Sequence, residues 1–154
     1  IAFAPTRVYN ENNILIKHFE GKRQGYLDLK EIGDIPCSFH PFIIRNKQKK
    51  FEEIRSQDVY NTACILNEHK TKISMINGAY YKLNLQKKSV TKEDGFAHKI
   101  NLAYVKYQIK SLKNKNIKIA RVFAIRRINN IKYIQWKINN NNKSFYEYLN
   151  EKEN

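Results

Sequence analysis

The sequence has no long apolar run, few cysteines and glycines, and few acidic residues. No stretch approaches the roughly 18 to 20 apolar residues that a membrane-spanning helix needs, so we expect no membrane span. The 2 cysteines, Cys37 and Cys64, are too few for a disulfide framework. The 5 scattered glycines form no phosphate-binding loop. These absences leave no sign of a cofactor or a small-molecule substrate.

Basic residues outnumber acidic ones by 29 to 14, which gives a net charge of +15. This excess predicts a polyanionic partner, because neutralising phosphates releases counterions and drives association. Nucleic acid fits best, and a solvated basic surface or an anionic membrane are the alternatives. With 42% hydrophobic residues in 154, the chain can also bury one sizeable core, so it is not a disordered basic tail.

Most of the charge lies between Lys99 and Lys137, a block that contains eleven Lys or Arg and no Asp or Glu. Its first part predicts a helix with two stripes. The stripe expected to be buried consists of Leu102, Val105, Ile109 and Leu112. The stripe expected to present cations consists of Lys99, Lys106, Lys110 and Lys113.

The rest of the block is rich in β-branched residues. Ile117 to Ile125 and Ile131 to Ile138 are interpreted as two β-strands, separated by the turn-prone pair Asn129-Asn130. A short helix is expected from Ser144 to Glu151.

Upstream of the block, residues 1 to 45 are interpreted as strands and loops. Asn13 to Phe19 and Gln24 to Leu29 predict a hairpin, and the prolines within Ile35 to Ile44 favour an edge strand or an extended connection. A helix is expected from about Phe51 to His69. A second hairpin is predicted from Thr71 to Leu85, with its turn at Asn77-Gly78.

Several short motifs, in order, resemble the RAP domain family, which is abundant in apicomplexan parasites. The matching segments are Asp94-Gly95-Phe96-Ala97-His98, then Lys106, Ile109 and Leu112, then Ile131-Lys132-Tyr133-Ile134-Gln135-Trp136, and finally Tyr148-Leu149. Lys132 and Gln135 stand where the family usually has Pro and Glu. The asparagine tract at 139 to 142 and the frequent Lys, Asn and Ile agree with an AT-rich genome.

The resemblance implies an α+β fold, with a mixed β-sheet flanked by helices like a degenerate restriction-endonuclease core. It covers roughly residues 51 to 152. We therefore expect a RAP-like RNA-binding domain at residues 47 to 154. Residues 1 to 46 would form a β-rich N-terminal extension that adds strands or contacts a neighbour.

The resemblance also implies non-enzymatic RNA binding in an organelle, the mitochondrion before the plastid. A basic chain without helical repeats suits a structural component of a mitochondrial ribosome, bound to rRNA and to neighbouring ribosomal proteins. The alternatives are an extra-ribosomal RNA processing or stability factor, a metal-dependent nuclease, and a protein-binding scaffold. The expected RNA-binding residues are His98, Lys99, Lys106, Lys110, Lys113, Lys115, Lys118, Arg121, Arg126, Arg127 and Lys132.

Aromatic residues in this block have two interpretations. Tyr104, Tyr107 and Tyr133 either belong to the core or stack on unpaired bases, and the core is favoured. Trp136 is expected in the core.

No catalytic or metal-binding residue is expected. The nuclease superfamily to which the RAP fold is related binds a metal through carboxylates on two strands. Here Asn84 stands at the first acidic position, and Lys92-Glu93-Asp94-Gly95 has Lys at the second. An amide and an ammonium do not replace two carboxylates as ligands of a hard cation. Asp28-Leu29-Lys30 is interpreted as solvated strand charge, and Cys37 with His40 is half a zinc site without a second pair.

Overall fold

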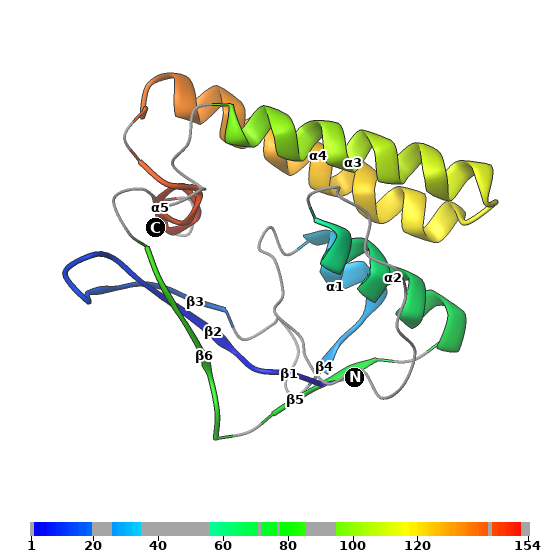
Figure 1. Cartoon of the computed structure of the whole chain (residues 1–154), viewed down its shortest axis with the longest axis horizontal. Helices are drawn as coiled ribbons and strands as arrows, with labels where there is room; N and C mark the ends of the chain where they lie inside the picture. Colours follow the sequence, from blue (N-terminus) through cyan, green and yellow to red (C-terminus); the bar gives the residue numbers. More distant parts are fainter. Residues whose placement is uncertain are drawn as a thin grey trace.

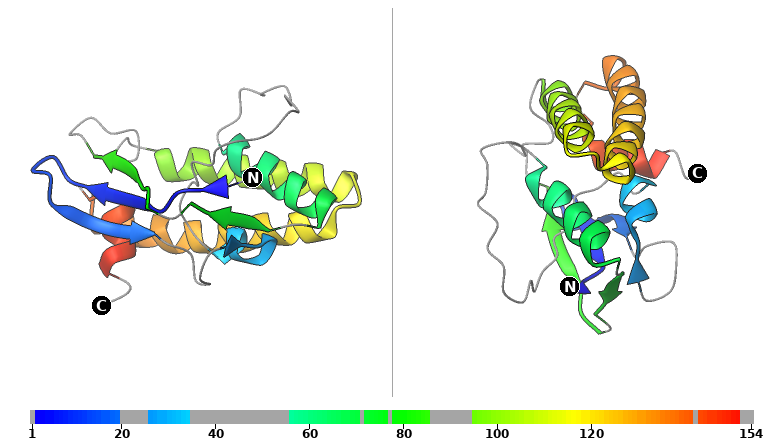
Figure 2. Two further views of the ribbon diagram at one scale, coloured as in Figure 1. Left: turned by 90° about the horizontal axis from the view of Figure 1, so that it is seen from below. Right: turned by 90° about the vertical axis from the view of Figure 1, so that its right-hand side faces the viewer.

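A computed structural model describes residues 2–19, 26–34, 56–70, 72–76, 78–85, 95–141 and 143–151. In these ranges the chain forms an α+β fold with two small mixed β-sheets and several helices. Two long helices, α3 and α4, lie side by side along one edge of the molecule, and the sheets lie on the opposite side (Figures 1 and 2). The shorter helices α1 and α2 lie between these two parts, under α3 and α4 (Figure 1).

The two sheets are mixed because each combines one parallel and one antiparallel pairing. In one sheet β2 pairs antiparallel with β3 and parallel with β6. In the other, β5 pairs parallel with β1 and antiparallel with β4. The strands are β1 (Ala2–Phe3), β2 (Thr6–Tyr9), β3 (Leu15–Phe19), β4 (Tyr26–Leu27), β5 (Ile73–Met75) and β6 (Tyr81–Asn84).

Each sheet therefore combines strands that precede residue 46 in the sequence with a strand that follows it. The division into an extension of residues 1–46 and a domain of residues 47–154 stays a prediction. In the described residues, β1 and β2 complete sheets with β5 and β6, so the early strands add to the later ones.

The prediction of two hairpins is wrong, although strands do form within the predicted segments. β3 pairs with β2 rather than with β4, and β5 pairs with β1 and β4 rather than with β6. Gly78 does take the left-handed conformation of a turn residue, with φ +78°. That turn carries the chain from one sheet to the other, because strand pairing is decided by tertiary packing rather than by the local turn.

The helices are α1 (Leu29–Asp34), α2 (Gln57–His69), α3 (Phe96–Lys113), α4 (Ile117–Ile138) and α5 (Phe145–Glu151). The expected helices at 51–69 and 144–151 are confirmed where they are described, and residues 51–55 lie outside the described ranges. So does the expected edge strand at 35–44. Within the described ranges, no helix is both long and apolar enough to span a membrane.

The two strands expected at 117–125 and 131–138 are wrong, because the whole segment is the single helix α4. Asn130, expected in a turn, lies inside this helix, where its side-chain amide donates a 2.8 Å hydrogen bond to the Ala97 carbonyl. The buried positions of α4 recur every three or four residues, which is the helical period and not the strand period. They are Ile119, Ala120, Val122, Phe123, Arg126, Asn130 and Tyr133.

The prediction of which face of α3 lies in the core is also wrong. Leu102, Ile109 and Leu112 are 61%, 48% and 53% exposed. The buried face is instead made of Ala97, Ala103, Tyr104, Tyr107 and Ser111. Large aromatic rings bury more area than aliphatic side chains, and small residues beside them let α4 approach closely.

The main core is therefore aromatic where α2, α3 and α4 meet. The Tyr107 ring stacks on Tyr60 at 4.5 Å between centroids and lies 5.3 Å from Phe123. Tyr104 belongs to the same cluster. A second cluster contains Ala97, Tyr133, Tyr148 and Leu149, with the partly buried Trp136 packed against it. Tyr104, Tyr107 and Tyr133 are thus core residues, as favoured.

Candidate nucleic-acid interface

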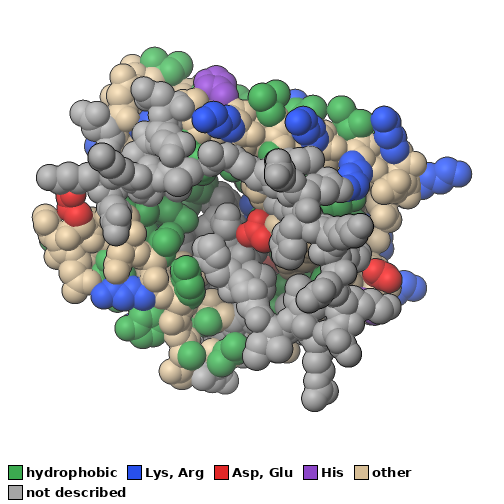
Figure 3. Space-filling view, viewed as in Figure 1, with side chains coloured by type: hydrophobic (Ala, Val, Ile, Leu, Met, Phe, Trp, Pro, Cys, Tyr) green, Lys and Arg blue, Asp and Glu red, His purple; other side chains and the backbone are tan. Residues whose placement is uncertain are grey.

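The outer surface of α3 carries a line of evenly spaced cations. Lys99, Lys106 and Lys113 are exposed and stand seven residues apart, which places them on one side of the helix at intervals of roughly 10 Å. The exposed Leu102 and Ile109 lie between them. Lys and Arg side chains alternate with hydrophobic ones along this edge of the molecule (Figure 3). The predicted cationic stripe is therefore present, but it shares its face with the aliphatic side chains expected in the core.

More exposed cations follow at the turn between α3 and α4 and along α4. Lys115 occupies the turn with φ 56°, and Lys118 and Arg121 lie in the first turns of α4. Seven of the predicted RNA-binding residues are exposed cations, here called the basic surface. They are Lys99, Lys106, Lys113, Lys115, Lys118, Arg121 and Lys132.

Arg126 was also predicted to bind RNA, and the structure contradicts this. Its side chain is only 2% exposed. The guanidinium Nε donates a 2.8 Å hydrogen bond to the Ile32 carbonyl, and Nη1 donates one of 3.2 Å to the Tyr104 hydroxyl. Arg126 therefore ties α4 to α1 and α3 inside the fold and is not available to a phosphate.

The remaining predicted cations are only partly accessible. Arg127 is partly buried and donates a 2.8 Å hydrogen bond to the Gln108 side chain. The Lys110 ammonium lies 5.3 Å from the centroid of the Tyr60 ring. His98 is exposed in the first turn of α3, next to Lys99. His98 can therefore join the basic surface, whereas Arg127 and Lys110 already have contacts within the fold.

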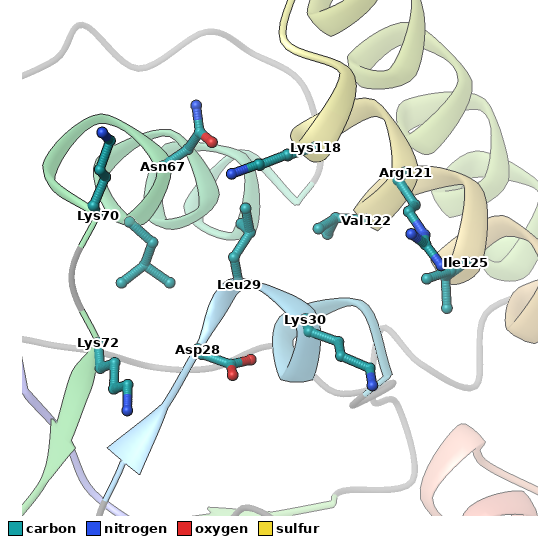
Figure 4. A pocket seen from close by; sticks show the side chains of 11 residues that line it. Asp28, Leu29, Lys30, Asn67, Lys70, Lys72, Lys118, Arg121, Val122 and Ile125 are labelled. Atoms are coloured by element: carbon teal, nitrogen blue, oxygen red, sulfur yellow. The ribbon is translucent and has the colours of Figure 1, made fainter.

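A pocket of about 650 Å³ lies beside the start of α4, between α1 and α2 (Figure 4). Five cations line it, and they come from three separate parts of the chain. They are Lys30, Lys70, Lys72, Lys118 and Arg121, and all are exposed. No sequence pattern connects Lys30, Lys70 and Lys72 with the segment that forms α4, because only the fold brings them next to it.

Asp28 is the acidic residue of this lining, and its carboxylate is engaged in helix capping. Its Oδ1 accepts a 2.9 Å hydrogen bond from the Glu31 N–H, and Glu31 Oε2 accepts one of 3.1 Å from the Asp28 N–H. This reciprocal pair is a capping box at the start of α1. Asp28 therefore has a structural role in the described fold.

The sheet of β3, β2 and β6 adds a surface with cations over aromatic rings, which the sequence did not indicate. The Arg7 guanidinium lies 4.2 Å from the centroid of the Tyr80 ring, and the Lys82 ammonium lies 4.7 Å from that of Tyr9. Tyr80 and Tyr81 are 48% and 41% exposed. Exposed tyrosines of the kind that can stack on bases thus lie on this sheet and not on α3 or α4.

The motif residues near the C-terminus form a polar network as well as a core. Burial, with a contribution from the Glu147 carboxylate, raises the pKa of Tyr133 to about 12. A hydrogen bond from Lys143 to Glu151, 2.5 Å long, lowers the pKa of that carboxyl group. The Trp136 indole donates a second hydrogen bond of 3.0 Å to Glu151. Trp136 is therefore held between the second core cluster and a surface ion pair.

Metal ligands do not gather in the part of the chain that the structure describes. No group of three or more His, Cys, Asp or Glu residues in those ranges could hold a metal ion. Asn84 is exposed on β6, and Cys64 is partly buried on α2. Glu93, Asp94, Cys37 and His40 lie outside the described ranges.

Comparison of the chain with protein-family models, with curated proteins and with solved structures finds no match.

Proposed function

We propose that the protein binds RNA without catalysing a reaction on it, and that the basic surface holds the RNA backbone. One observation carries the proposal. The α3 and α4 segment contains eleven Lys or Arg and no Asp or Glu, and seven of these cations are exposed. With no carboxylate on either helix to neutralise them, these cations create a positive potential that attracts phosphates.

Lysine side chains on such a surface contact phosphate oxygens and position the RNA, but they read no sequence. Affinity should come mainly from counterion release and fall steeply with salt. Bases of a single-stranded segment would find the exposed rings of Tyr80 and Tyr81 for stacking.

The assignment to a mitochondrial ribosome rests on the resemblance to RAP domains and on the mixed surface. Aliphatic side chains with large exposed fractions lie on both helices, for example Leu102 at 61%, Ile117 at 72% and Ile128 at 55%. Exposed apolar groups among cations suit a protein that contacts both rRNA and neighbouring ribosomal proteins. On the same resemblance, the α+β fold is proposed to be a degenerate restriction-endonuclease core.

The packing of the motif residues supports the resemblance. Tyr133 and Trp136 of the Ile-x-Tyr-x-x-Trp segment contact Tyr148 of the Tyr-Leu pair, with ring centroids 5.4 and 5.2 Å apart. Ala97 of the first motif lies in the same cluster. Residues that are distant in sequence but belong to one family pattern thus share one core.

Charge variants of the α3 line test the RNA-binding proposal. Lys106→Gln with Lys113→Gln should weaken binding of a single-stranded RNA and reduce its dependence on salt, because two phosphate contacts are removed. The matched control is Leu102→Gln with Ile109→Gln, on the same face with no change of charge, which should leave the salt dependence unchanged. Equal effects of the two double variants would contradict a role for the cations.

Sedimentation of the native protein from organelle extract tests the ribosomal assignment. Co-migration with a large particle that RNase or moderate salt disrupts would support an RNA-held component. An association that survives RNase would instead favour the protein-binding scaffold, for which the exposed Leu102, Ile117 and Ile128 are the relevant observation.

A further inference from the structure

The pocket between α1, α2 and α4 combines an apolar floor with a cationic rim. The floor is aliphatic and comes from all three helices: Leu29, Leu66, Val122 and Ile125. In the close view Leu29 points from α1 into the space between α2 and α4 (Figure 4). A volume of about 650 Å³ lies within the range of roughly 300 to 1,000 Å³ typical of small-ligand sites.

The rim favours an anion. Lys118 extends from α4 across the opening toward Asn67 on α2, and Arg121 and Lys30 lie on the α4 and α1 sides (Figure 4). Lys70 and Lys72 flank the end of α2. The lining contains five Lys or Arg side chains and one carboxylate, that of Asp28, which accepts a hydrogen bond from the Glu31 N–H.

The start of α4 adds to this field. The helix is 22 residues long, has no acidic residue in its first turn, and has no side-chain hydrogen bond capping its N-terminus. The Asn116 amide oxygen, which stands at the N-cap, instead accepts a 3.2 Å hydrogen bond from the Asn67 side chain. The positive end of the helix dipole therefore reinforces Lys118 and Arg121 at the same side of the pocket.

We propose that this pocket binds one phosphorylated nucleoside unit, with its base against the aliphatic floor and its phosphate held by Lys118 and Arg121. A purely inorganic anion would leave the apolar floor unused, and a purely apolar ligand would make no use of Lys118 and Arg121 at the rim. A nucleotide matches both halves, because its base is a flat ring with low charge and its phosphate is an anion, singly charged within a strand and up to doubly charged in a free monophosphate. Lys30 and Lys70 would meet a second or flanking phosphate.

Two ligands offer this combination of base and phosphate: an unpaired nucleotide of a bound RNA strand, or a free nucleotide. Binding of the RNA nucleotide rests on the proposed function, and binding of a free nucleotide does not. In the RNA-bound case the pocket would anchor one extruded nucleotide while the α3 line, through Lys99, Lys106 and Lys113, follows the backbone.

The test compares two charge-matched double variants with two probes. The pocket variant is Lys118→Glu with Arg121→Glu, and the control is Lys106→Glu with Lys113→Glu; all four positions are exposed. The probes are adenosine 5′-monophosphate and a fluorescent oligouridylate, with circular dichroism to verify that each variant is folded. The pocket variant should lose about tenfold or more in affinity for the monophosphate, because one charge-assisted hydrogen bond is already worth that factor. The control should bind it within about twofold of the parent, because neither Lys106 nor Lys113 lines the pocket.

A third variant, Leu29→Trp, tests the floor without changing the charge. It should weaken binding of adenosine monophosphate but not of inorganic phosphate, because only the nucleoside needs the apolar space. Equal binding of the monophosphate by the parent and the pocket variant would overturn the inference, and so would equal loss in both charge variants.

The outcomes also separate this inference from the proposed function. If the pocket variant keeps the parent's affinity for the monophosphate while the Lys106 and Lys113 control loses affinity for oligouridylate, the pocket inference fails and RNA binding by the basic surface stands. If the parent binds the monophosphate through Lys118 and Arg121 but no RNA, the proposed function fails and the pocket remains a site for a free nucleotide.

Discussion

Replacing Arg126 by methionine separates a structural cation from an RNA-binding one. The side chain is 2% exposed and donates hydrogen bonds to the Ile32 carbonyl and the Tyr104 hydroxyl. Methionine fills a similar volume but leaves both oxygens without this donor. Arg121, five residues earlier on the same helix, is exposed, so Arg121→Met removes the same charge from the surface.

The magnitude follows from the two lost hydrogen bonds. Each buried acceptor left without a partner costs about 1 to 3 kcal/mol. Methionine also removes a charge whose burial is unfavourable, and this gain offsets part of the combined cost of the two acceptors. We therefore expect Arg126→Met to lower the free energy of unfolding by about 1 to 3 kcal/mol. At roughly 2 to 4 °C per kcal/mol for a chain of this size, the melting temperature should fall by about 2 to 12 °C. Arg121→Met should stay within about 0.5 kcal/mol of the parent.

Denaturant unfolding and RNA binding, measured on both variants, provide the assay. At a temperature where both are folded, Arg126→Met should keep the parent's salt dependence of RNA binding, whereas Arg121→Met should reduce it. An Arg126→Met variant as stable as the parent, with the same loss of RNA affinity as Arg121→Met, would contradict a structural role for Arg126.

Three further predictions concern the C-terminal cluster. Because burial raises the pKa of Tyr133 to about 12, the unfolded chain loses this proton near the ordinary tyrosine pKa of 10.0 while the folded chain retains it. The stability that Tyr133 contributes is therefore complete below pH 10 and declines between pH 10 and 12. Raising the pH from 7 to 11 should therefore lower the melting temperature of the parent more than that of Tyr133→Phe. The lowered pKa of Glu151 gives stability the opposite dependence on pH. The contribution of Glu151 to stability is present above the ordinary carboxyl pKa of 4.5 and is lost as the pH falls below it. The fluorescence of Trp136, the only tryptophan, should report this protonation, and Lys143→Met should shift its midpoint upward. Ser144→Ala removes the hydroxyl that accepts a 3.3 Å hydrogen bond from the N–H three residues later, and should destabilise α5 by about 0.5 to 2 kcal/mol in a denaturant titration; no change would show that the cap is dispensable.

The sequence predicted elements whose local signals agree with their packing. Ser144 directly precedes α5 and Glu147 follows three residues later, a capping-box pattern that needs no information from the rest of the fold. For α4 the local signals conflicted, since its isoleucines favour a strand but its buried residues repeat at the helical period. Strand propensity alone predicts two strands here, whereas the helical period of the buried residues decides the structure.

The same conflict explains the errors at the candidate site. Arg126 stands four residues after Val122 and seven before Tyr133, in phase with the buried side of α4, whereas Arg121 is out of phase with it. A helical interpretation would have separated these two arginines. The cationic pocket has no comparable signal, because Lys30, Lys70 and Lys118 lie far apart in sequence and meet only after α1, α2 and α4 have packed together.

The most direct test of the account is the salt dependence of RNA binding by the intact protein. If about three to seven cations of the basic surface contact phosphates, the logarithm of the association constant should fall with the logarithm of the salt concentration with a slope of about −2 to −5. Substitution of Lys106 and Lys113 by glutamine should make this slope shallower by about 1 to 1.5, which corresponds to two lost contacts. A slope near zero, or one that these two substitutions leave unchanged, would contradict the claim that this surface holds an RNA backbone.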